Sequence, residues 1–261
     1  MMFKTILSAA GVYKAYEKWL WRQVKNGVKP EHIAIILDGN RRWATDKALN
    51  PWTGHAKGAE KVEKLVDWCL RLDVKSITLY TFSTENFQRS KGEVEEIMRI
   101  AGENFRNLLT DERIHNNKVR VKVIGRLGML PPELQQRIID VENATQNYDE
   151  HFLNFAFAYG GRAEIVDAAK KIAEEVHAGK MKPEEVDEKT FEKYLYTSHL
   201  PKQDPDLIIR TSGEERLSGF LLWQSAYSEL CFLDVYWPDF RLIDLLRAVR
   251  TFQNRKRRFG A

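Results

Sequence analysis

The sequence predicts an α/β fold: a single domain whose central six-stranded, mostly parallel sheet is flanked by helices, with an amphipathic helix added at the N-terminus. The first observation is that six short apolar runs alternate with segments of helical periodicity, a pattern typical of βαβ units. The second is the length of 261 residues, which suits one large domain, or one domain with an appendage. The third is the composition, with 43% hydrophobic and 30% charged residues, as in soluble globular proteins.

Residues 3–25 are predicted to form an amphipathic helix, because apolar and aromatic residues recur near helical spacing between lysines and arginines. Gly27 and Pro30 then mark a boundary, so the chain divides into an N-terminal helical extension, residues 1–30, and a main domain, residues 31–261. A basic helix rich in tryptophan fits two arrangements: it lies in a membrane interface, or it packs against the domain or a dimer partner. Both stay open at this point.

The rest of the chain alternates between strand and helix. Apolar runs predict strands over residues 32–37, 76–82, 119–124, 152–158, 206–210 and 229–235. Helical periodicity predicts helices over residues 57–72, 92–115, 131–145, 161–178, 187–196 and 240–257. Strands that alternate with helices of this length form βαβ units with right-handed crossovers, and a mostly parallel sheet follows from them.

Several classes of protein lack support in this sequence. No run of 18 apolar residues predicts a transmembrane helix, and the N-terminus is not a convincing signal peptide. Cys69 and Cys231 form no CxxC pair, which favours thiols in a reducing compartment, so we expect a cytoplasmic protein, with peripheral contact to a membrane left open. P-loop, GxGxxG, HExxH, GxSxG and DDxxD motifs are absent. Basic clusters lie near both termini, but no nucleic-acid-binding motif accompanies them, so we expect no nucleic-acid partner.

Polar clusters follow the predicted strands, and in open α/β sheets ligands bind outside the carboxyl ends of the strands. The first cluster, Asp38–Trp43, comes directly after an apolar run and supplies a carboxylate, a glycine, an amide and two arginines; it continues in His55. The second is Ser83–Arg89, the third is Arg210–Ser218, and the fourth begins at Glu229. If the sheet is parallel, the first three clusters meet at one edge.

Arginines dominate that edge, and their planar forks suit phosphate because each donates two parallel hydrogen bonds. So many cations would repel one another without a bridging polyanion, so we expect one or two phosphate groups to bind there. Asp38 fits either an ordinary salt bridge or a Mg²⁺ ligand, since Mg²⁺ takes one or two carboxylates together with substrate phosphates. Glu229 is the candidate second ligand, from this chain or from another subunit. The arginines expected at this edge of the sheet, beside these carboxylates, are Arg41, Arg42, Arg89, Arg210 and Arg216.

These residues resemble the motifs of the cis-prenyltransferase family, whose best-known member is undecaprenyl diphosphate synthase. The resemblance covers nearly the whole chain, from His32 to Gly260, and is to the archaeal type. The N-terminal extension separately resembles those of archaeal and eukaryotic long-chain members. It implies a Mg²⁺-dependent condensation of isopentenyl diphosphate with an allylic diphosphate to a long-chain Z-polyprenyl diphosphate, the precursor of a lipid glycosyl carrier. The matching blocks are residues 32–44, Phe82–Arg89 (FSxEN(W/F)xR), Ala158–Arg162 (YGGR), 210–218, 220–229 and 237–240.

The resemblance also implies a role for each matching residue. Asp38 would be catalytic and would hold Mg²⁺ together with Glu229, and Asn86 is the position that the family assigns to proton removal. A tunnel for the growing tail would run between the sheet and the helices predicted at 57–72 and 92–115, whose apolar faces also fit an ordinary core. The implied substrate-binding residues are Gly39, Asn40, Arg41, Arg42, Trp43, His55, Ser83, Thr84, Glu85, Phe87, Arg89, Arg210, Arg216, Leu217 and Ser218.

Two further implications concern partners and substrate. Arg258–Gly260 resembles a C-terminal element that reaches the partner's site in homodimers, and the N-terminal extension fits peripheral membrane contact. Pro51, however, stands four residues before His55, where members commonly carry an arginine that meets the allylic diphosphate. Proline has no charge and no donor, so the primer stays open. A prenyltransferase of the same fold with another acceptor or a short product, and a non-catalytic subunit of a prenyltransferase complex, are the alternatives.

Overall fold

Six parallel strands form one sheet in the order β3-β4-β2-β1-β5-β6. The structure is a computed structural model that describes residues 11–255. The first residues of the predicted N-terminal helix and the predicted element Arg258–Gly260 therefore lie outside the described residues. The predicted sheet is confirmed, and it is parallel throughout. The strands are β1 (His32–Ile36), β2 (Ser76–Ser83), β3 (Val119–Ile124), β4 (His151–Tyr159), β5 (Leu207–Arg210) and β6 (Glu229–Phe232).

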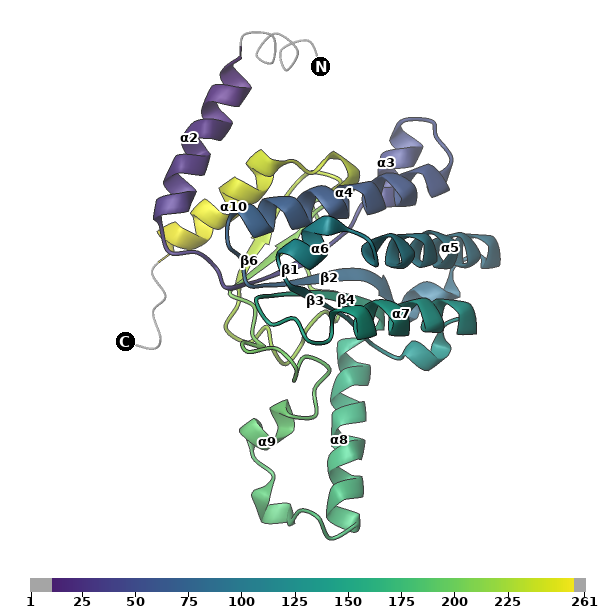
Figure 1. Ribbon diagram of the computed structural model, residues 1–261. Helices are drawn as coiled ribbons and strands as arrows, with labels where there is room; N and C mark the ends of the chain where they lie inside the picture. Colours follow the sequence, from purple (N-terminus) through teal and green to yellow (C-terminus); the bar gives the residue numbers. More distant parts are fainter. Residues whose placement is uncertain (1–10, 256–261) are drawn as a thin grey trace.

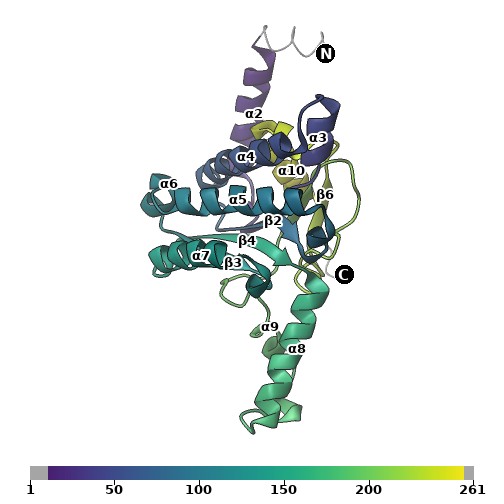
Figure 2. The ribbon, with the colours of Figure 1, turned by 90° about the vertical axis from the view of Figure 1, so that its right-hand side faces the viewer.

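Helices cover the sheet unequally. Ile33 and Ile35 of β1 face the larger apolar core, which the helices of one face complete, whereas Ala34 and Ile36 face a smaller cluster on the other side. Figures 1 and 2 show α8 and α9 extending away from the sheet on the side opposite to α4 and α10. The helices are α2 (Val12–Asn26), α3 (Asn40–Asp46), α4 (Pro51–Arg71), α5 (Lys91–Leu108), α6 (Glu112–Asn116), α7 (Pro132–Thr145), α8 (Gly161–His177), α9 (Glu188–Glu192) and α10 (Leu242–Asn254). Short 3₁₀ turns are η1 (Thr84–Gln88), η2 (Leu127–Met129), η3 (Pro183–Glu185) and η4 (Trp237–Asp239).

Local capping explains where the helices differ from prediction. The helix predicted at 57–72 begins earlier, because Pro51 occupies its first turn and the Asn50 side chain accepts a hydrogen bond from the Trp52 amide. The helix predicted at 92–115 is two helices, because the Asp111 side chain caps a new one by accepting from the Arg113 amide at 2.9 Å. The prediction missed α3, and the helix predicted at 187–196 is shorter.

The N-terminal helix α2 packs on α10 (Figure 1), with Leu20 and Val24 fully buried between them. Arg247 lies 5.3 Å from the centre of the Tyr16 ring, and Arg250 lies 4.9 Å from that of Trp19. Cation–π contacts of this kind let basic and aromatic residues share one interface. The described part of the extension therefore packs on the protein itself. No described helix combines the length and the apolarity that crossing a bilayer requires.

Glycines let α4 lie against the start of α3. A Cβ atom on Gly54 would stand 2.0 Å from the carbonyl oxygen of Asn40, and one on Gly58 would stand 2.4 Å from its side-chain oxygen. The indole of Trp237 donates to the Gly58 carbonyl at 2.8 Å and closes the same junction. Because only Gly39 separates Asp38 from α3, this packing determines where the strand-end residues point.

We predict that Gly54→Ala lowers the free energy of unfolding by more than about 2 kcal/mol, since backbone atoms rather than a flexible side chain must move. Gly92→Ala is the matched control, because a Cβ there meets open space in α5 and alanine favours the helix by about 0.5–1 kcal/mol. Urea unfolding followed by circular dichroism measures both. Equal stabilities for the two variants would contradict the packing of α3 on α4.

Candidate active site

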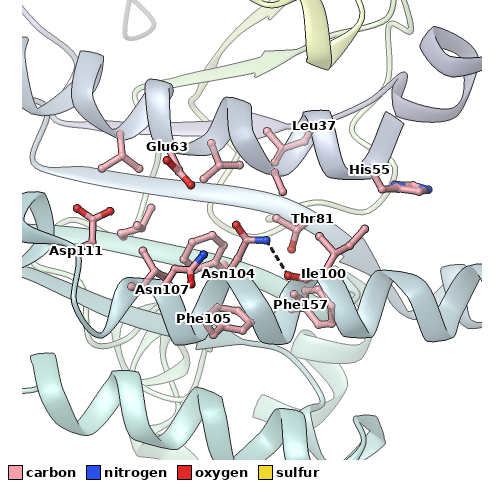
Figure 3. Close-up of a pocket in the computed structure, with 18 of the residues that line it drawn as sticks. Leu37, His55, Glu63, Thr81, Ile100, Asn104, Phe105, Asn107, Asp111 and Phe157 are labelled. Atoms are coloured by element: carbon pink, nitrogen blue, oxygen red, sulfur yellow. Dashed lines mark hydrogen bonds between the residues drawn. The ribbon is translucent and has the colours of Figure 1, made fainter. Parts of the chain in front are cut away.

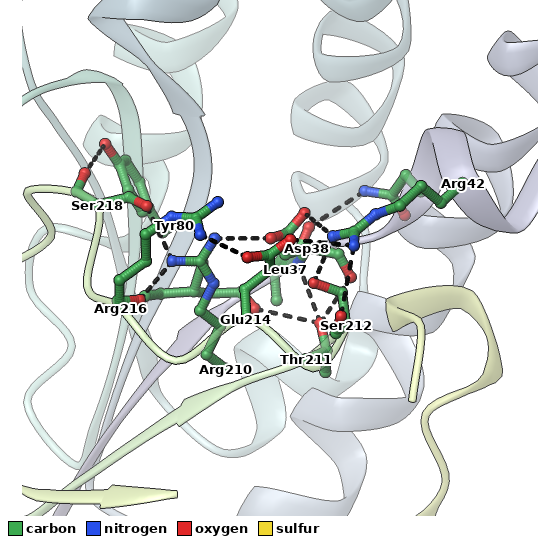
Figure 4. Close-up of polar contacts among 12 residues, drawn as sticks. Leu37, Asp38, Arg42, Tyr80, Arg210, Thr211, Ser212, Glu214, Arg216 and Ser218 are labelled. Atoms are coloured by element: carbon green, nitrogen blue, oxygen red, sulfur yellow. Dashed lines mark hydrogen bonds and ion pairs between the residues drawn. The ribbon is translucent and has the colours of Figure 1, made fainter. Parts of the chain in front are cut away.

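Three strand ends meet at the carboxyl edge of the sheet, as the sequence predicted. Ile36 of β1 is in register with Tyr80 of β2 on one side and with Arg210 of β5 on the other. Asp38 therefore lies beside the ends of both neighbouring strands (Figure 4). A cavity of about 760 Å³ opens there and is lined by residues of all three clusters.

Arg210 is the buried centre of this edge, with only 4% of its surface exposed. One terminal nitrogen donates to Oδ2 of Asp38 at 2.8 Å, and the other donates to Oγ of Ser218 at 2.8 Å and to the carbonyl of Arg216 (Figure 4). One guanidinium therefore joins the turn after β1 to the loop after β5. Thr211 reinforces the junction, because its hydroxyl donates to the Asp38 carbonyl at 2.7 Å.

Asp38 stays ionised at neutral pH. Burial alone would raise the pKa of its carboxyl group, but hydrogen bonds from Arg210 and Ser212 and the charges of Arg210 and Arg42 outweigh burial, so the pKa lies below its usual value. Its side chain remains 29% exposed toward the cavity. Gly39 follows with a φ of 101°, and a Cβ there would stand 2.6 Å from the Tyr236 ring, so glycine is required at the turn.

Two carboxylates that the sequence analysis missed hold the arginines in place. Glu214 accepts from Arg42 at 3.1 Å and also pairs with Arg216. The nearly buried Glu93 accepts from Arg89 at 2.9 Å and lies 3.6 Å from Arg41. The spacing of four residues between Arg89 and Glu93 at the start of α5 is the one signal that the sequence offered.

His55 lies beside Glu93 and its two arginines, with its Nε2 at 3.4 Å from Oε1 of Glu93. Burial lowers the pKa of the His55 imidazole, and the charge of Arg89 lowers it further, so the ring is neutral at neutral pH. A neutral ring nitrogen beside a carboxylate and two arginines can donate or accept a hydrogen bond, but it adds no further positive charge to the site.

Most predicted binding residues line the cavity, and four do not. Trp43 is buried beneath Lys47, whose Nζ lies 4.1 Å from the ring centre, and Phe87 packs edge-on against Phe82. Thr84 lies against Gly160, and Leu217 packs on the smaller apolar cluster. The predicted residues that line it are Asp38, Gly39, Asn40, Arg41, Arg42, His55, Ser83, Glu85, Asn86, Arg89, Arg210, Arg216 and Ser218.

Asn86 reaches the cavity, but its side-chain oxygen accepts a hydrogen bond from the Ser83 amide at 3.0 Å and caps the turn η1. A neutral amide is a poor base, and here its carbonyl oxygen already accepts a hydrogen bond from a backbone amide. The geometry therefore gives Asn86 a part in shaping the loop after β2.

Glu229 does not meet Asp38 within one chain. It begins β6 in register with Leu207, whereas Asp38 lies beyond the opposite end of β1. Five residues of parallel strand separate the two levels by roughly 16 Å. Glu229 pairs instead with Arg255. Within one chain the two carboxylates therefore cannot share a metal ion, because the first residue of a strand lies at the edge of the sheet opposite to the site. Of the two arrangements that the sequence left open, a Glu229 supplied by another subunit stays a prediction.

A second, apolar cavity of about 140 Å³ continues from the polar one, between α4, α5 and the sheet (Figure 3). Its lining is mostly apolar and includes Val62, Ile100 and Phe157. The helices that the sequence analysis considered for a tunnel thus border a cavity as well as the core.

Comparison with known proteins agrees with this geometry. The family model described as "Putative undecaprenyl diphosphate synthase" matches residues 36–260. The tritrans,polycis-undecaprenyl-diphosphate synthase (geranylgeranyl-diphosphate specific) of Methanopyrus kandleri is 55% identical over 254 residues, which are 97% of this chain and 93% of the relative.

Solved structures agree as well. The crystal structure of lavandulyl diphosphate synthase from Lavandula x intermedia in complex with dimethylallyl diphosphate matches with a TM-score of 0.86 and 37% identity, over 89% of this chain and 99% of that one. A probable undecaprenyl diphosphate synthase from Campylobacter jejuni matches with a TM-score of 0.72 and 32% identity, over 90% of this chain and 100% of that one. The chain therefore belongs to the undecaprenyl diphosphate synthase family, and it is a prenyltransferase.

Proposed function

We propose that this prenyltransferase condenses isopentenyl diphosphate with an allylic diphosphate, in the presence of Mg²⁺, to give a long-chain Z-polyprenyl diphosphate that serves as a lipid glycosyl carrier precursor. The observation that carries the proposal is that an arginine-lined cavity opens into an apolar one. Leu37, Asn40, His55, Thr81 and Ile97 line both. A ligand with a diphosphate head and a hydrocarbon tail matches both parts.

The donor set around Asp38 fits Mg²⁺. The side chain offers an ionised carboxylate to the cavity, and Mg²⁺ needs only one or two carboxylates when it keeps water and binds substrate phosphate. No group of three or more His, Cys, Asp or Glu side chains within residues 11–255 would hold a metal ion alone, so the ion would bind together with the diphosphate. When bound, Mg²⁺ would offset the negative charge of the departing diphosphate. We also propose that a partner subunit's copy of this chain supplies a second carboxylate to the ion.

The residues of the chain divide between the two substrates. Arg41, Arg42 and Arg89 would hold the allylic diphosphate, and Arg210, Arg216 and Ser218 the isopentenyl diphosphate. The allylic C–O bond breaks, and diphosphate leaves with the electron pair. The double bond of isopentenyl diphosphate supplies the pair for the new C–C bond, and the proton lost from it passes to an oxygen of the departing diphosphate. The arginines stabilise the charge that develops on the leaving group.

Members of the family commonly carry an arginine where this chain has Pro51, and we propose that Arg41 makes the contact with the allylic diphosphate in its place. Pro51 occupies the first turn of α4 and offers the cavity no donor. The Arg41 side chain is 56% exposed and lies 3.6 Å from Glu93, so it is free to turn to an allylic diphosphate. Because the Methanopyrus kandleri relative is named as geranylgeranyl-diphosphate specific, we propose geranylgeranyl diphosphate as the primer.

We predict that the purified protein with Mg²⁺, geranylgeranyl diphosphate and radiolabelled isopentenyl diphosphate gives a ladder of products that converges on one long chain. A single short product would favour the second candidate, a short-chain prenyltransferase, which the small apolar cavity of about 140 Å³ supports. No incorporation with any primer from dimethylallyl to geranylgeranyl diphosphate would contradict a catalytic role and favour a non-catalytic subunit.

We predict that Arg216→Ala raises KM for isopentenyl diphosphate about ten-fold or more and changes kcat less, because one charge-assisted fork to the diphosphate is lost. Lys91→Ala is the control, since its side chain is 90% exposed and pairs only loosely with Glu95 at 3.8 Å. Steady-state kinetics with saturating primer distinguishes them. An unchanged KM for isopentenyl diphosphate in the Arg216 variant would remove this arginine from that subsite.

We infer further that the enzyme acts as a cytoplasmic homodimer in contact with a membrane, which would receive the lipid product. Support for membrane contact comes from α2, where Val12 and Trp19 keep 48% and 44% of their surface exposed beside basic residues.

We predict that the protein floats with anionic vesicles in a density gradient and that Trp19→Ala weakens this association. Equal flotation of both proteins would contradict a part for α2, and sedimentation equilibrium tests the dimer.

A further inference from the structure

The loop between β5 and β6, residues 211–228, brings Arg216 and Ser218 to the polar cavity on an unfavourable backbone. The φ angles of Ser218 and Leu221 are 48° and 45°, in the left-handed region that residues other than glycine seldom adopt. Such conformations persist only where the surrounding structure fixes them. The loop therefore depends on contacts that hold it from outside.

The sheet holds the first half of the loop. The Arg210 guanidinium donates to the Arg216 carbonyl and, at 2.8 Å, to the Ser218 hydroxyl. The Tyr80 hydroxyl donates to the Ser218 carbonyl at 3.4 Å (Figure 4), and the Tyr80 ring stacks on Phe220 with its centre 4.7 Å away. The hydrogen bonds from the sheet end at Ser218, so the second half of the loop needs another anchor.

Helix α8 supplies that second anchor. The Gly161 amide donates to the Gly219 carbonyl at 2.9 Å, and a Cβ atom on Gly161 would stand 2.3 Å from the same oxygen, so the backbones touch. Further along α8, Oε1 of Glu164 accepts from Nε2 of Gln224 at 3.1 Å. Glu164 and Gln224 are each 1% exposed. The helix therefore holds the second half of the loop at two points.

Glu164 joins this loop to two other segments. Its Oε1 also accepts from the Tyr196 amide, after α9, at 2.8 Å, and its Oε2 accepts from the hydroxyl of Tyr159, the last residue of β4. We call Glu164 and its donors Tyr159, Tyr196 and Gln224 the buried hub. None of these four residues lines the polar cavity. Any influence of the hub on substrate must therefore pass through the loop.

A carboxylate in this position is costly. Burial raises the pKa of the Glu164 carboxyl, and the hydrogen bonds from Tyr159, Tyr196 and Gln224 offset only part of that rise. A buried charge lowers stability unless its partners compensate fully. General stability therefore does not account for a glutamate here, whereas the need to hold three segments in one arrangement does.

We propose that Glu164 is a positioning residue for isopentenyl diphosphate, an inference that rests on the proposed function. By holding Gln224 it fixes the second half of the loop, and with it the strained backbone at Ser218. That backbone determines how Arg216 and the Ser218 hydroxyl face the diphosphate. Loss of the hub leaves the loop free to relax and weakens this subsite.

The allylic subsite has a separate support. Arg41 and Arg89, which we assign to the allylic diphosphate, pair with Glu93 of α5. A loop that relaxes between β5 and β6 leaves these pairs in place. The proposal therefore separates the two substrates: a change at the hub affects isopentenyl diphosphate and spares the primer.

The experiment measures steady-state kinetics with Mg²⁺, geranylgeranyl diphosphate and isopentenyl diphosphate for the wild type, Glu164→Ala and Glu164→Gln. We expect Glu164→Ala to raise KM for isopentenyl diphosphate about five-fold or more and KM for the primer less than about two-fold. Glu164→Gln restores KM, because its oxygen can still accept from Gln224 and the Tyr196 amide while its NH₂ group donates to the Tyr159 hydroxyl.

Glu142→Ala is the matched control. The Glu142 carboxylate, on α7, also accepts from a backbone amide, that of Val123 at 2.8 Å, and from a side chain, Nζ of Lys122 at 2.7 Å. Glu142 lines neither the polar nor the apolar cavity. We expect both KM values of this variant to equal those of the wild type.

The KM values distinguish positioning from stability, because partial unfolding removes active enzyme and lowers apparent kcat while KM stays the same. An unchanged KM for isopentenyl diphosphate in folded Glu164→Ala protein, an equal rise in both KM values, or a Glu164→Gln enzyme as impaired as Glu164→Ala would overturn the proposal. If Glu164→Ala does not fold, Gln224→Met decides by the same criterion, since it breaks the same contact from the loop. If neither folds, the hub serves the whole fold and the proposal fails. A wild type that incorporates no isopentenyl diphosphate with any primer contradicts the proposed function itself.

Discussion

The hydrogen bonds of Arg210 are the interaction on which the rest of the site depends. The arginine ends β5, Asp38 follows β1, and the two strands are neighbours in register, so the pair forms wherever the sheet forms. The same guanidinium holds the Arg216 carbonyl and the Ser218 hydroxyl. Because the arginine is almost fully buried, removal of its carboxylate partner would leave an uncompensated charge, which is strongly destabilising. Sheet formation and site formation are therefore one event.

Glu93 and Glu214 offset the repulsion between the arginines of the cationic edge. Each carboxylate lies between two arginines, so the repulsion that a bridging polyanion would relieve is already offset within the chain. The pair between Arg42 and Glu214 is partly exposed and so contributes little. The diphosphates of the two substrates carry more charge and more acceptors, so they can replace Glu214, one on Arg42 and the other on Arg216. The carboxylates keep the arginine forks oriented until substrate arrives.

The sequence predicted the parallel sheet and the meeting of three strand ends, because buried strands appear as short apolar runs and parallel strands bring their carboxyl ends together. It missed Glu93 and Glu214 as partners, since their contacts with Arg41 and Arg42 join segments far apart in the chain. The direction of a side chain is equally invisible: Trp43 and Phe87 point into the protein from motifs whose neighbours face the cavity. Glu229 lies far from Asp38 within one chain for a topological reason, because the first residue of a parallel strand lies at the opposite edge from the last. The break at Asp111 is a capping contact that helical periodicity does not register.

The most direct test of the central claim is whether Asp38 and Mg²⁺ bind diphosphate together at this edge. Isothermal titration calorimetry with inorganic pyrophosphate, with and without Mg²⁺, measures this for the wild type and for Asp38→Asn protein that circular dichroism shows to be folded. The substitution keeps the size of the side chain and removes its charge. We predict that Mg²⁺ tightens pyrophosphate binding to the wild type at least ten-fold and that Asp38→Asn abolishes this gain. The same Mg²⁺ effect in both proteins would contradict the account, because the ion would then bind without the carboxylate that the sheet places among the arginines.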